Sequence, residues 1–357
     1  MVRKSIQAVI IVLLFITGCK KEDGNGPQLP SSSNGRKVYV ICEGSMGNGN
    51  SSLGLYLPDK DSAYEDIYKA ANNNMPLGDV FQSMTRIGNQ YFLCINNSDK
   101  ILIINKDTWK LEGSIPVSKP RYILPVSASK AYVSSLFSNN LYLINPAAQT
   151  NYGSIGLAYN SAEGMFLKDN IAYIAPWDTA SQEVLTLNVN NDQPGARIQL
   201  PGRAAQEIAI DQEQKLWILA GNVYKGKLAT LTRYDPVSGS ILKSYTFPTA
   251  ADPIRMVFNK AKDSLYFIEV NYNGGTTHNG IYRMGIHDAN LPAQPFIQAQ
   301  PLQYFWALGV DPVTGYIYVG DPKGFTQRGQ VYIYKQDGVM VRNFRAGVGP
   351  GHFLFDQ

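Results

Sequence analysis

The hexapeptide KVYVIC at residues 37–42 sets a pattern that recurs six more times along the 357-residue chain. The later copies are NQYFLC (89–94), KAYVSS (130–135), IAYIAP (171–176), KLWILA (215–220), SLYFIE (264–269) and YIYVGD (316–321). Their aromatic residues stand 41 to 52 residues apart and are Tyr39, Tyr91, Tyr132, Tyr173, Trp217, Tyr266 and Tyr318. A period of about 40 to 50 residues with four short strands per unit is typical of a β-propeller. The sequence therefore predicts an all-β fold with seven blades.

The two ends of the repeat region predict how the ring closes. The first repeat has no strand before Tyr39, whereas the last repeat is followed by a surplus strand at residues 351–355. We expect this C-terminal strand to become the inner strand of blade one, because a closed ring leaves no open sheet edge. The propeller is thus predicted to occupy residues 37–357 as one domain.

Residues 1–18 have the features of a lipoprotein signal peptide. Arg3 and Lys4 precede an apolar run over residues 8–16, which is too short to cross the hydrocarbon core of a membrane. The run leads to Gly18 and Cys19, in a small-residue cleavage site that resembles a bacterial lipobox. We therefore expect cleavage before Cys19 and lipidation of its thiol. A plain secretory signal followed by a chance cysteine is the alternative.

Residues 19–36 are expected to form a lipidated tether. Residues 20–23 (KKED) resemble the export signal that sends some Gram-negative lipoproteins to the outer face of the outer membrane; an ordinary solvated tether is the alternative. Residues 24–36 consist mostly of Gly, Pro, Ser and Asn without an apolar period, which predicts a flexible stalk. We expect an outer-membrane protein that faces the cell exterior, with the lipid as its only membrane attachment.

Charge and cysteine content restrict the possible partners and cross-links. The formal net charge is +4, and loss of Arg3 and Lys4 leaves 30 basic and 28 acidic residues, so 30 − 28 = +2. A balance this close to zero argues against a nucleic-acid partner. Cys42 and Cys94 each follow their repeat aromatic by three residues, so we expect equivalent positions in adjacent blades, too far apart for a disulfide. Both are interpreted as small buried apolar residues.

One face of the propeller is built from loops that lead into the inner strands and loops that join second and third strands. We call it the loop face. Its candidate ligand-binding residues are Phe81, Gln82, Ser83, Arg121, Tyr122, Glu163, Trp177, Asn222, Tyr224, Tyr272, Trp306, Asp321, Phe325 and His352. Aromatic area beside amides and hydroxyls, with few charges, suits a large, flat, partly apolar ligand that carries amides. The alternative is that the aromatics only cap the interfaces between blades.

The sequence lacks the motifs of the common enzyme classes. Its histidines, His278, His287 and His352, do not have the spacing of a metal triad, and there is no nucleophile elbow or P-loop. An acid/base pair between His352 and Glu163 or Glu207 across the channel is one catalytic possibility. We therefore expect a protein without enzymatic activity, cofactor or metal.

Four short segments resemble the YncE-like surface propellers, in the lipoprotein branch typified by BtuG. They are Cys42-Glu43-Gly44, Phe81-Gln82-Ser83-Met84, Pro120-Arg121-Tyr122 and Glu163-Gly164-Met165. Cys42 replaces the Asn usual in the family, and Ala162 stands where Pro usually precedes the last motif. The resemblance implies a seven-bladed propeller that captures cobalamin without turning it over and sits on a TonB-dependent transporter.

The resulting hypothesis is a surface lipoprotein that captures a nutrient, with cobalamin or a related corrinoid as the first choice. The partners would be this small molecule and a TonB-dependent outer-membrane receptor. One alternative is a propeller lactonase or lyase, which needs an acid/base pair or a divalent metal in the channel. The other is a scaffold that uses the same face to bind a polypeptide.

Overall fold

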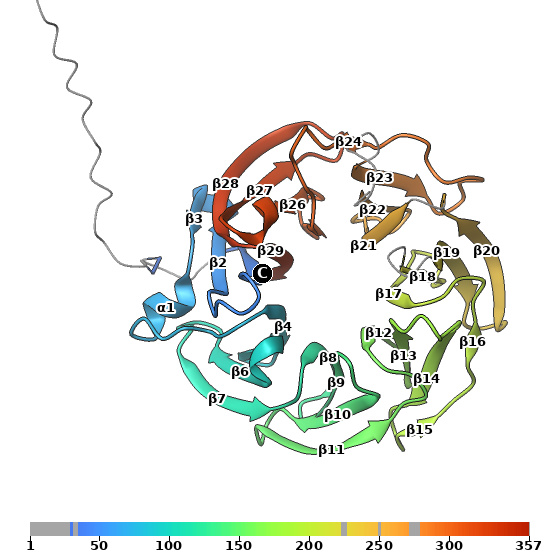
Figure 1. The fold of residues 1–357 in the computed structure, drawn as a ribbon, viewed down its shortest axis with the longest axis horizontal. Helices are drawn as coiled ribbons and strands as arrows, with labels where there is room; N and C mark the ends of the chain where they lie inside the picture. The colour runs from blue at the N-terminus through green and yellow to red at the C-terminus, as the bar shows by residue number, and fades with distance from the viewer. Residues whose placement is uncertain (1–28, 31–34, 223–226, 249–250, 271–278, 357) are drawn as a thin grey trace, which may run out of the picture.

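The computed structural model describes residues 29–30, 35–222, 227–248, 251–270 and 279–356. The signal peptide and most of the tether, including Cys19, lie outside the described residues, so their assignment stays a prediction. Within the described part, seven antiparallel sheets are arranged in a ring around a central axis (Figure 1). The all-β, seven-bladed prediction is confirmed. No helix among these residues is long and apolar enough to span a bilayer.

Each blade runs from an inner strand at the channel to an outer strand at the rim. Blade one contains β29 (Pro350–Asp356), β1 (Lys37–Cys42), β2 (Ser52–Leu57) and β3 (Ser62–Tyr64). Blade two contains β4 (Phe81–Ile87), β5 (Gln90–Ile95), β6 (Lys100–Asn105) and β7 (Leu111–Pro116). Blade three contains β8 (Pro120–Ser127), β9 (Lys130–Ser135), β10 (Asn140–Asn145) and β11 (Thr150–Gly156).

The remaining four blades follow the same order. Blade four contains β12 (Ala162–Lys168), β13 (Ile171–Pro176), β14 (Glu183–Asn188) and two short outer strands, β15 (Gln193–Pro194) and β16 (Ile198–Gln199). Blade five contains β17 (Ala205–Ile210), β18 (Leu216–Asn222), β19 (Lys227–Asp235) and β20 (Ser240–Thr246). Blade six contains β21 (Asp252–Phe258), β22 (Ser264–Val270), β23 (Gly280–Gly285) and β24 (Ile297–Gln298). Blade seven contains β25 (Ala307–Val310), β26 (Ile317–Asp321), β27 (Arg328–Tyr334) and β28 (Met340–Val348).

Among the described residues, the short helical segments lie in connections between strands. They are η1 (Pro58–Lys60), α1 (Ile67–Ala71), η2 (Asn96–Ser98) and η4 (Lys323–Phe325). Asp66 caps α1 by accepting a hydrogen bond from the Lys69 backbone N–H, which satisfies one of the unpaired donors at the helix start. Ile67 and Tyr68 of α1 are buried between blades one and two, so the helix fills part of that interface.

The C-terminal strand closes the ring as predicted. β29 pairs antiparallel with β1, from Lys37 opposite Asp356 to Cys42 opposite Pro350. The Asp356 carboxylate also accepts hydrogen bonds from Tyr91 and Arg86 of blade two. The first and last segments of the chain therefore share one sheet, and the strand that joins them is tied to the next blade (Figure 1).

The repeat aromatics fill the interfaces between neighbouring blades, with one correction. Six of the seven pack against the following blade, as Tyr39 does between blades one and two. In blade two, Tyr91 packs on the preceding blade, against Tyr39 at a ring distance of 5.0 Å. The neighbouring Phe92 takes the repeat position between blades two and three. Successive side chains of a strand point to opposite faces of the sheet. An assignment of the repeat position that is wrong by one residue therefore predicts the wrong neighbouring blade.

The same offset corrects the interpretation of the cysteines. Cys42 packs between blades seven and one, on the preceding side of its sheet. Cys94 packs between blades two and three, on the following side of its sheet. The two positions are therefore not equivalent. Both thiols are free and fully buried, and burial raises the pKa of each to about 12, so they act as small apolar residues.

The start of each inner strand has a recurring backbone geometry that positions the loop face. In five blades the residue before the inner strand has a left-handed conformation; these are Gly349, Val80, Lys119, Ser161 and Ala204. The carbonyl of each accepts a hydrogen bond of 2.7–3.0 Å from the residue four places after the repeat aromatic. Such a conformation is costly for a β-branched residue such as Val80, so the repeated hydrogen bond is what holds it.

Candidate functional site

The inner strands of six blades carry one extra residue near their start. The pairing with the second strand shifts by one residue there, for example between Phe81 and Ser83 or between Ala205 and Glu207. A β-bulge of this kind bends the strand and turns a side chain away from the regular alternation. The bulged segments contain Gln82, Arg121, Tyr122, Glu163, Gln206, Arg255 and, in blade one, Gly351. The bulges thus gather polar side chains from different blades at the channel.

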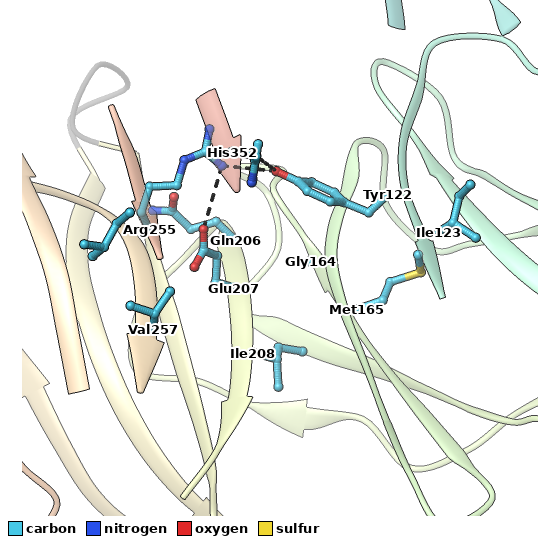
Figure 2. A pocket seen from close by; sticks show the side chains of 11 residues that line it. Tyr122, Ile123, Gly164, Met165, Gln206, Glu207, Ile208, Arg255, Val257 and His352 are labelled. Carbon is cyan, nitrogen blue, oxygen red and sulfur yellow. Dashed lines mark hydrogen bonds and ion pairs between the residues drawn. The ribbon is translucent and has the colours of Figure 1, made fainter. Parts of the chain in front are cut away.

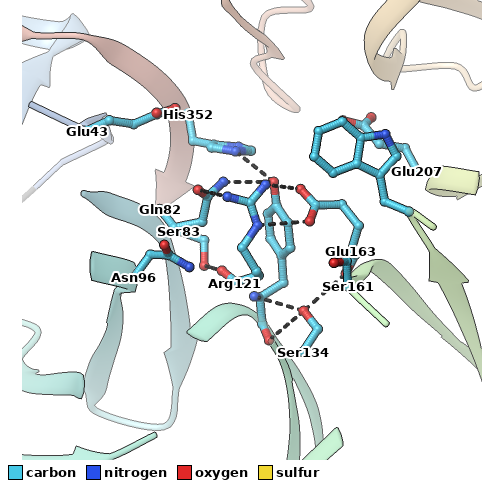
Figure 3. Close-up of polar contacts among 12 residues, drawn as sticks. Glu43, Gln82, Ser83, Asn96, Arg121, Ser134, Ser161, Glu163, Glu207 and His352 are labelled. Atoms are coloured by element: carbon cyan, nitrogen blue, oxygen red, sulfur yellow. Dashed lines mark hydrogen bonds and ion pairs between the residues drawn. The ribbon is translucent and has the colours of Figure 1, made fainter. Parts of the chain in front are cut away.

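A buried ion pair joins blades three and four at this point. Arg121 Nε donates to Glu163 Oε2 at 2.8 Å, and its Nη2 donates to Glu163 Oε1. Arg121 Nη1 also donates to Gln82 Oε1 of blade two, so one guanidinium links three blades (Figure 3). Burial alone would disfavour the cation, but the Glu163 carboxylate outweighs it and raises the Arg121 pKa above its ordinary value. Ser83 Oγ fixes the backbone by donating to the Arg121 carbonyl at 2.5 Å.

The Tyr122 hydroxyl is the centre of a second set of contacts. It accepts hydrogen bonds from Gln82 Nε2 and Arg255 Nη1, both at 3.2 Å, and lies 3.1 Å from His352 Nε2. Burial raises the pKa of Tyr122 to about 12, so the hydroxyl keeps its proton. Burial, with Arg255 and Arg121 nearby, holds the pKa of His352 well below its ordinary value. The neutral imidazole therefore accepts a hydrogen bond from the Tyr122 hydroxyl at Nε2.

Arg255 lies between two carboxylates and an indole. Its Nη2 is 3.8 Å from Glu43 Oε1 and its Nη1 is 3.9 Å from Glu207 Oε1. The guanidinium carbon stands 5.5 Å from the centre of the Trp306 ring, whose Nε1 donates to Glu43 Oε1 at 2.8 Å. Burial raises the pKa of both Glu43 and Glu207, although Arg255 opposes this shift for each. These contacts connect blades one, five, six and seven.

A cavity of about 260 Å³ adjoins this network inside the channel. Its polar lining comes from Tyr122, Gln206, Glu207, Arg255 and His352. Its apolar lining comes from Ile123, Met165, Ile208, Val257 and Leu308. Figure 2 shows the labelled polar side chains gathered at one end of the cavity and Ile208, Val257 and Met165 away from them. The cavity therefore offers hydrogen-bonding groups at one end and an apolar wall at the other.

The structure places the sequence-predicted residues in three different situations. Gln82, Arg121, Tyr122, Glu163 and His352 belong to the network, and Ser83 supports it. Phe81 is fully buried between blades one and two, and the fully buried Asp321 pairs with Lys323 at 2.8 Å. Tyr224 and Tyr272 lie outside the described residues, and of Asn222 only the backbone is described, at the end of β18.

Three predicted aromatics lie half-buried near the network. Trp306 contacts Phe325 edge-to-face, with ring centres 5.5 Å apart. Trp177 donates from Nε1 to the Gly221 carbonyl at 3.4 Å, across the interface between blades four and five. Trp177 and Trp306 therefore make hydrogen bonds within the fold in addition to presenting ring surface.

The expectation of a face with few charges was wrong, because Arg121, Arg255 and three glutamates meet at its centre. Glu43, Gln206 and Arg255 were not among the predicted ligand-binding residues, and Glu207 was considered only as a catalytic partner of His352. The sequence could have indicated all of them except Glu43, because the others lie at the starts of inner strands. These positions are equivalent to those of Gln82, Arg121 and Glu163. His352 contacts Tyr122, and no hydrogen bond or ion pair joins its described side chain to Glu163 or Glu207.

No group of three or more His, Cys, Asp or Glu side chains within the described ranges is placed to hold a metal ion. His287, the other described histidine, is exposed and pairs with Glu213 at 2.8 Å, away from the channel residues.

Most of the propeller matches one sequence family. The family described as a domain of unknown function, DUF5074, matches residues 36–347. The chain belongs to the DUF5074 family. This match begins one residue before β1 and ends one residue before the end of β28, so it covers the ring except for the closing strand β29. No curated protein matches the sequence.

Solved structures share the fold of this DUF5074 protein at low sequence identity. A quinonprotein alcohol dehydrogenase-like protein from Bacteroides thetaiotaomicron has a TM-score of 0.69 and 15% identity, covering 89% of this chain and 77% of that one. A protein from Lactobacillus plantarum has a TM-score of 0.64 and 11% identity, covering 90% and 99%. A putative 6-phosphogluconolactonase from Bacteroides fragilis has a TM-score of 0.62 and 10% identity, covering 92% and 100%. These similarities establish the propeller fold alone.

Proposed function

We propose that the protein is a lipid-anchored binding protein that captures a large, nearly uncharged nutrient on the loop face and does not convert it chemically. A corrinoid such as cobalamin is the ligand class that we favour. The captured ligand would pass to a TonB-dependent transporter in the outer membrane. The corrinoid and the transporter come from the resemblance to BtuG-like propellers, and the anchor comes from the segment around Cys19.

The observation that carries the binding role is the mutual hydrogen bonding of the buried network. Arg121 and Arg255 face Glu43, Glu163 and Glu207, so the formal charges of the site nearly cancel. Burial further disfavours ionisation of Glu43 and Glu207. Such a site neither strongly attracts nor strongly repels a cationic or an anionic ligand. It suits a ligand whose amides can both donate and accept hydrogen bonds.

The half-buried indoles supply the apolar part of the proposed site. Trp177 and Trp306 come from blades four and seven, and Phe325 extends the surface of Trp306. Rigid aromatic rings lose little entropy when they contact a flat ligand, which favours affinity. Their hydrogen bonds to Gly221 and Glu43 hold both indoles in place before a ligand arrives.

Replacement of Trp177 by Ala is expected to weaken cobalamin binding by about 30-fold, because truncating an aromatic hot-spot residue costs about 2 kcal/mol. The measurement is titration calorimetry with cyanocobalamin on the purified protein. Trp306→Phe keeps a ring but removes the bond to Glu43, so it should have a smaller effect. Circular dichroism should show the same fold for both variants.

Tyr152→Ala provides the matched control, since Tyr152 is an exposed aromatic residue on the outer strand β11. Its loss should leave the titration unchanged. Absence of cobalamin binding by the wild-type protein would overturn the ligand assignment. Binding that survives Trp177→Ala unchanged would move the site away from this indole. Recovery of the ligand with altered mass would replace the binding role by an enzymatic one.

Replacement of Cys19 by Ala is expected to release the protein from membranes while leaving the propeller folded. The reason is that the proposed lipid is attached outside the ring, which begins at β1. Fractionation of cells into membrane and soluble parts, together with radiolabelled acyl incorporation, measures the result. Membrane association of the variant that persists in high salt would contradict the lipoprotein assignment.

A further inference from the structure

Glu269 occupies a position in blade six that faces the core between blades five and six. It follows Leu265 and Phe267 on the same side of β22, and both of these are buried in that interface. The position lies three residues after the repeat aromatic, where the other blades have Cys42, Ile95, Ser135, Pro176, Ala220 and Asp321. The only other acid in this set, Asp321, is neutralised by Lys323 at 2.8 Å. Glu269 is therefore the acid in this set that lacks a neutralising cation among the described residues.

No hydrogen bond or ion pair connects the Glu269 side chain to any residue that the structure describes. Burial raises its pKa to about 7, and burial is the sole cause. Glu269 is partly buried, and a carboxylate that is removed from water without a cation is costly, so buried charges in proteins are usually paired. Tyr282 of β23 is the other titratable group beside it; burial, followed by the Glu269 charge, raises the Tyr282 pKa.

A cavity of about 460 Å³ opens beside Glu269, between blades five and six. Its inner wall is aromatic: Phe267 stacks on Tyr282 with ring centres 5.5 Å apart and meets Phe247 edge-to-face at 5.3 Å. The rest of the lining is Thr246, Pro248, Ala251, Leu291, Pro292 and Ala293. Among the residues that the structure describes, no Lys, Arg, His or second acid lines this cavity.

The short outer strand of blade six explains why space remains here. β24 pairs with β23 only at Gly280 and Ile281, whereas β20 of blade five pairs over six positions with β19. Residues 291–293, which precede β24, therefore line the cavity in place of a full outer strand. Thr246, Pro248 and Ala293 are exposed, so the cavity communicates with solvent. It lies at the rim of the ring, and none of its described lining residues lines the channel cavity.

We propose that this cavity is a second binding site, which takes a small organic cation with an apolar body and an ammonium group. The ammonium would pair with Glu269, and the apolar body would lie against Phe247, Phe267 and Leu291. Aromatic rings attract cations through their negative faces, and a site shielded from water strengthens the ion pair. The site is independent of the function proposed for the channel.

The proposal is tested with 2-phenylethylamine and its neutral analogue 2-phenylethanol as probes on the purified protein, by titration calorimetry. We expect saturable binding of the amine at least about tenfold tighter than of the alcohol, as one charge-assisted contact contributes about 1.5 to 3 kcal/mol. Glu269→Gln should remove this preference. The affinity for the amine should fall as the pH drops below about 7, because protonated Glu269 no longer pairs with it.

Two further variants keep the test decisive. Leu291→Trp should fill the cavity and weaken both probes, whereas Glu207→Gln, in the channel, should change neither. Cobalamin binding is measured in parallel and should not respond to Glu269→Gln, so failure of one proposal is distinguishable from failure of the other. Equal affinity for amine and alcohol, an undiminished preference in Glu269→Gln, or no saturation of the amine up to about 10 mM would overturn the proposal.

Discussion

Deletion of residues 348–357 is expected to destabilise the whole propeller and lower its melting temperature by more than about 10 °C. The deletion removes β29, the inner strand of blade one, and leaves the fully buried β1 with an open edge. It also removes Phe353 and Phe355, whose rings contact Tyr318 of blade seven at 5.9 and 5.2 Å. Both rings are partly buried, so each contributes part of the roughly 1.5 to 3 kcal/mol of a fully buried Phe, against a total stability of about 5 to 15 kcal/mol.

The closing strand can also be supplied separately, which gives this prediction a direct control. A synthetic peptide of residues 348–357, added to the truncated protein, should pair with β1 and restore part of the lost melting temperature. A peptide in which both Phe353 and Phe355 are replaced by Ser should restore less, because it keeps the backbone pairing and loses the ring contacts. Thermal denaturation followed by circular dichroism measures all three samples. An unchanged melting temperature after the deletion would contradict the role of β29 in closing the ring.

The architecture could be predicted from the sequence because a propeller repeats its packing. Each repeat aromatic faces an interface between blades, so its spacing reports the number of blades directly. Ring closure followed from one missing strand at Tyr39 and one surplus strand at the C-terminus. The error in blade two has a local cause: Tyr91 and Phe92 are adjacent aromatics, and the pattern alone does not tell which of them faces blade three.

The site could be predicted only in part, since its geometry depends on the bulges at the inner-strand starts. Arg121, Glu163 and His352 were selected from loops that do meet at the channel. Arg255 was missed, and Glu207 was considered only as a catalytic partner of His352, because regular strand alternation does not indicate where a bulge turns a side chain. Phe81 was assigned to the ligand surface, yet it fills the core between blades one and two. The balance of charge depends on charged residues from five blades and becomes visible only when the ring is assembled.

Replacement of Arg121 by Met is expected to destabilise the protein by about 3 to 5 kcal/mol. The side chains of Arg121 and Glu163 are only 14% and 8% exposed, so the single change leaves the Glu163 carboxylate buried without its cation. The double replacement Arg121→Met with Glu163→Leu removes both charges and should recover most of the loss, because apolar residues of similar size can replace a buried ion pair. Urea unfolding of the two variants and the wild type measures the difference.

The same pair of variants separates stability from recognition. If the ion pair serves only the fold, the double variant should bind cobalamin as the wild type does once it is stable again. If it shapes the binding surface, binding should stay weak despite the recovered stability, because Arg121 also donates to Gln82 and so fixes the amide that contacts Tyr122. We expect the second result. Gln82→Leu keeps the ion pair but removes this amide, so it should also weaken cobalamin binding. Normal cobalamin binding by Gln82→Leu and by the double variant would show that Arg121 has only a structural role.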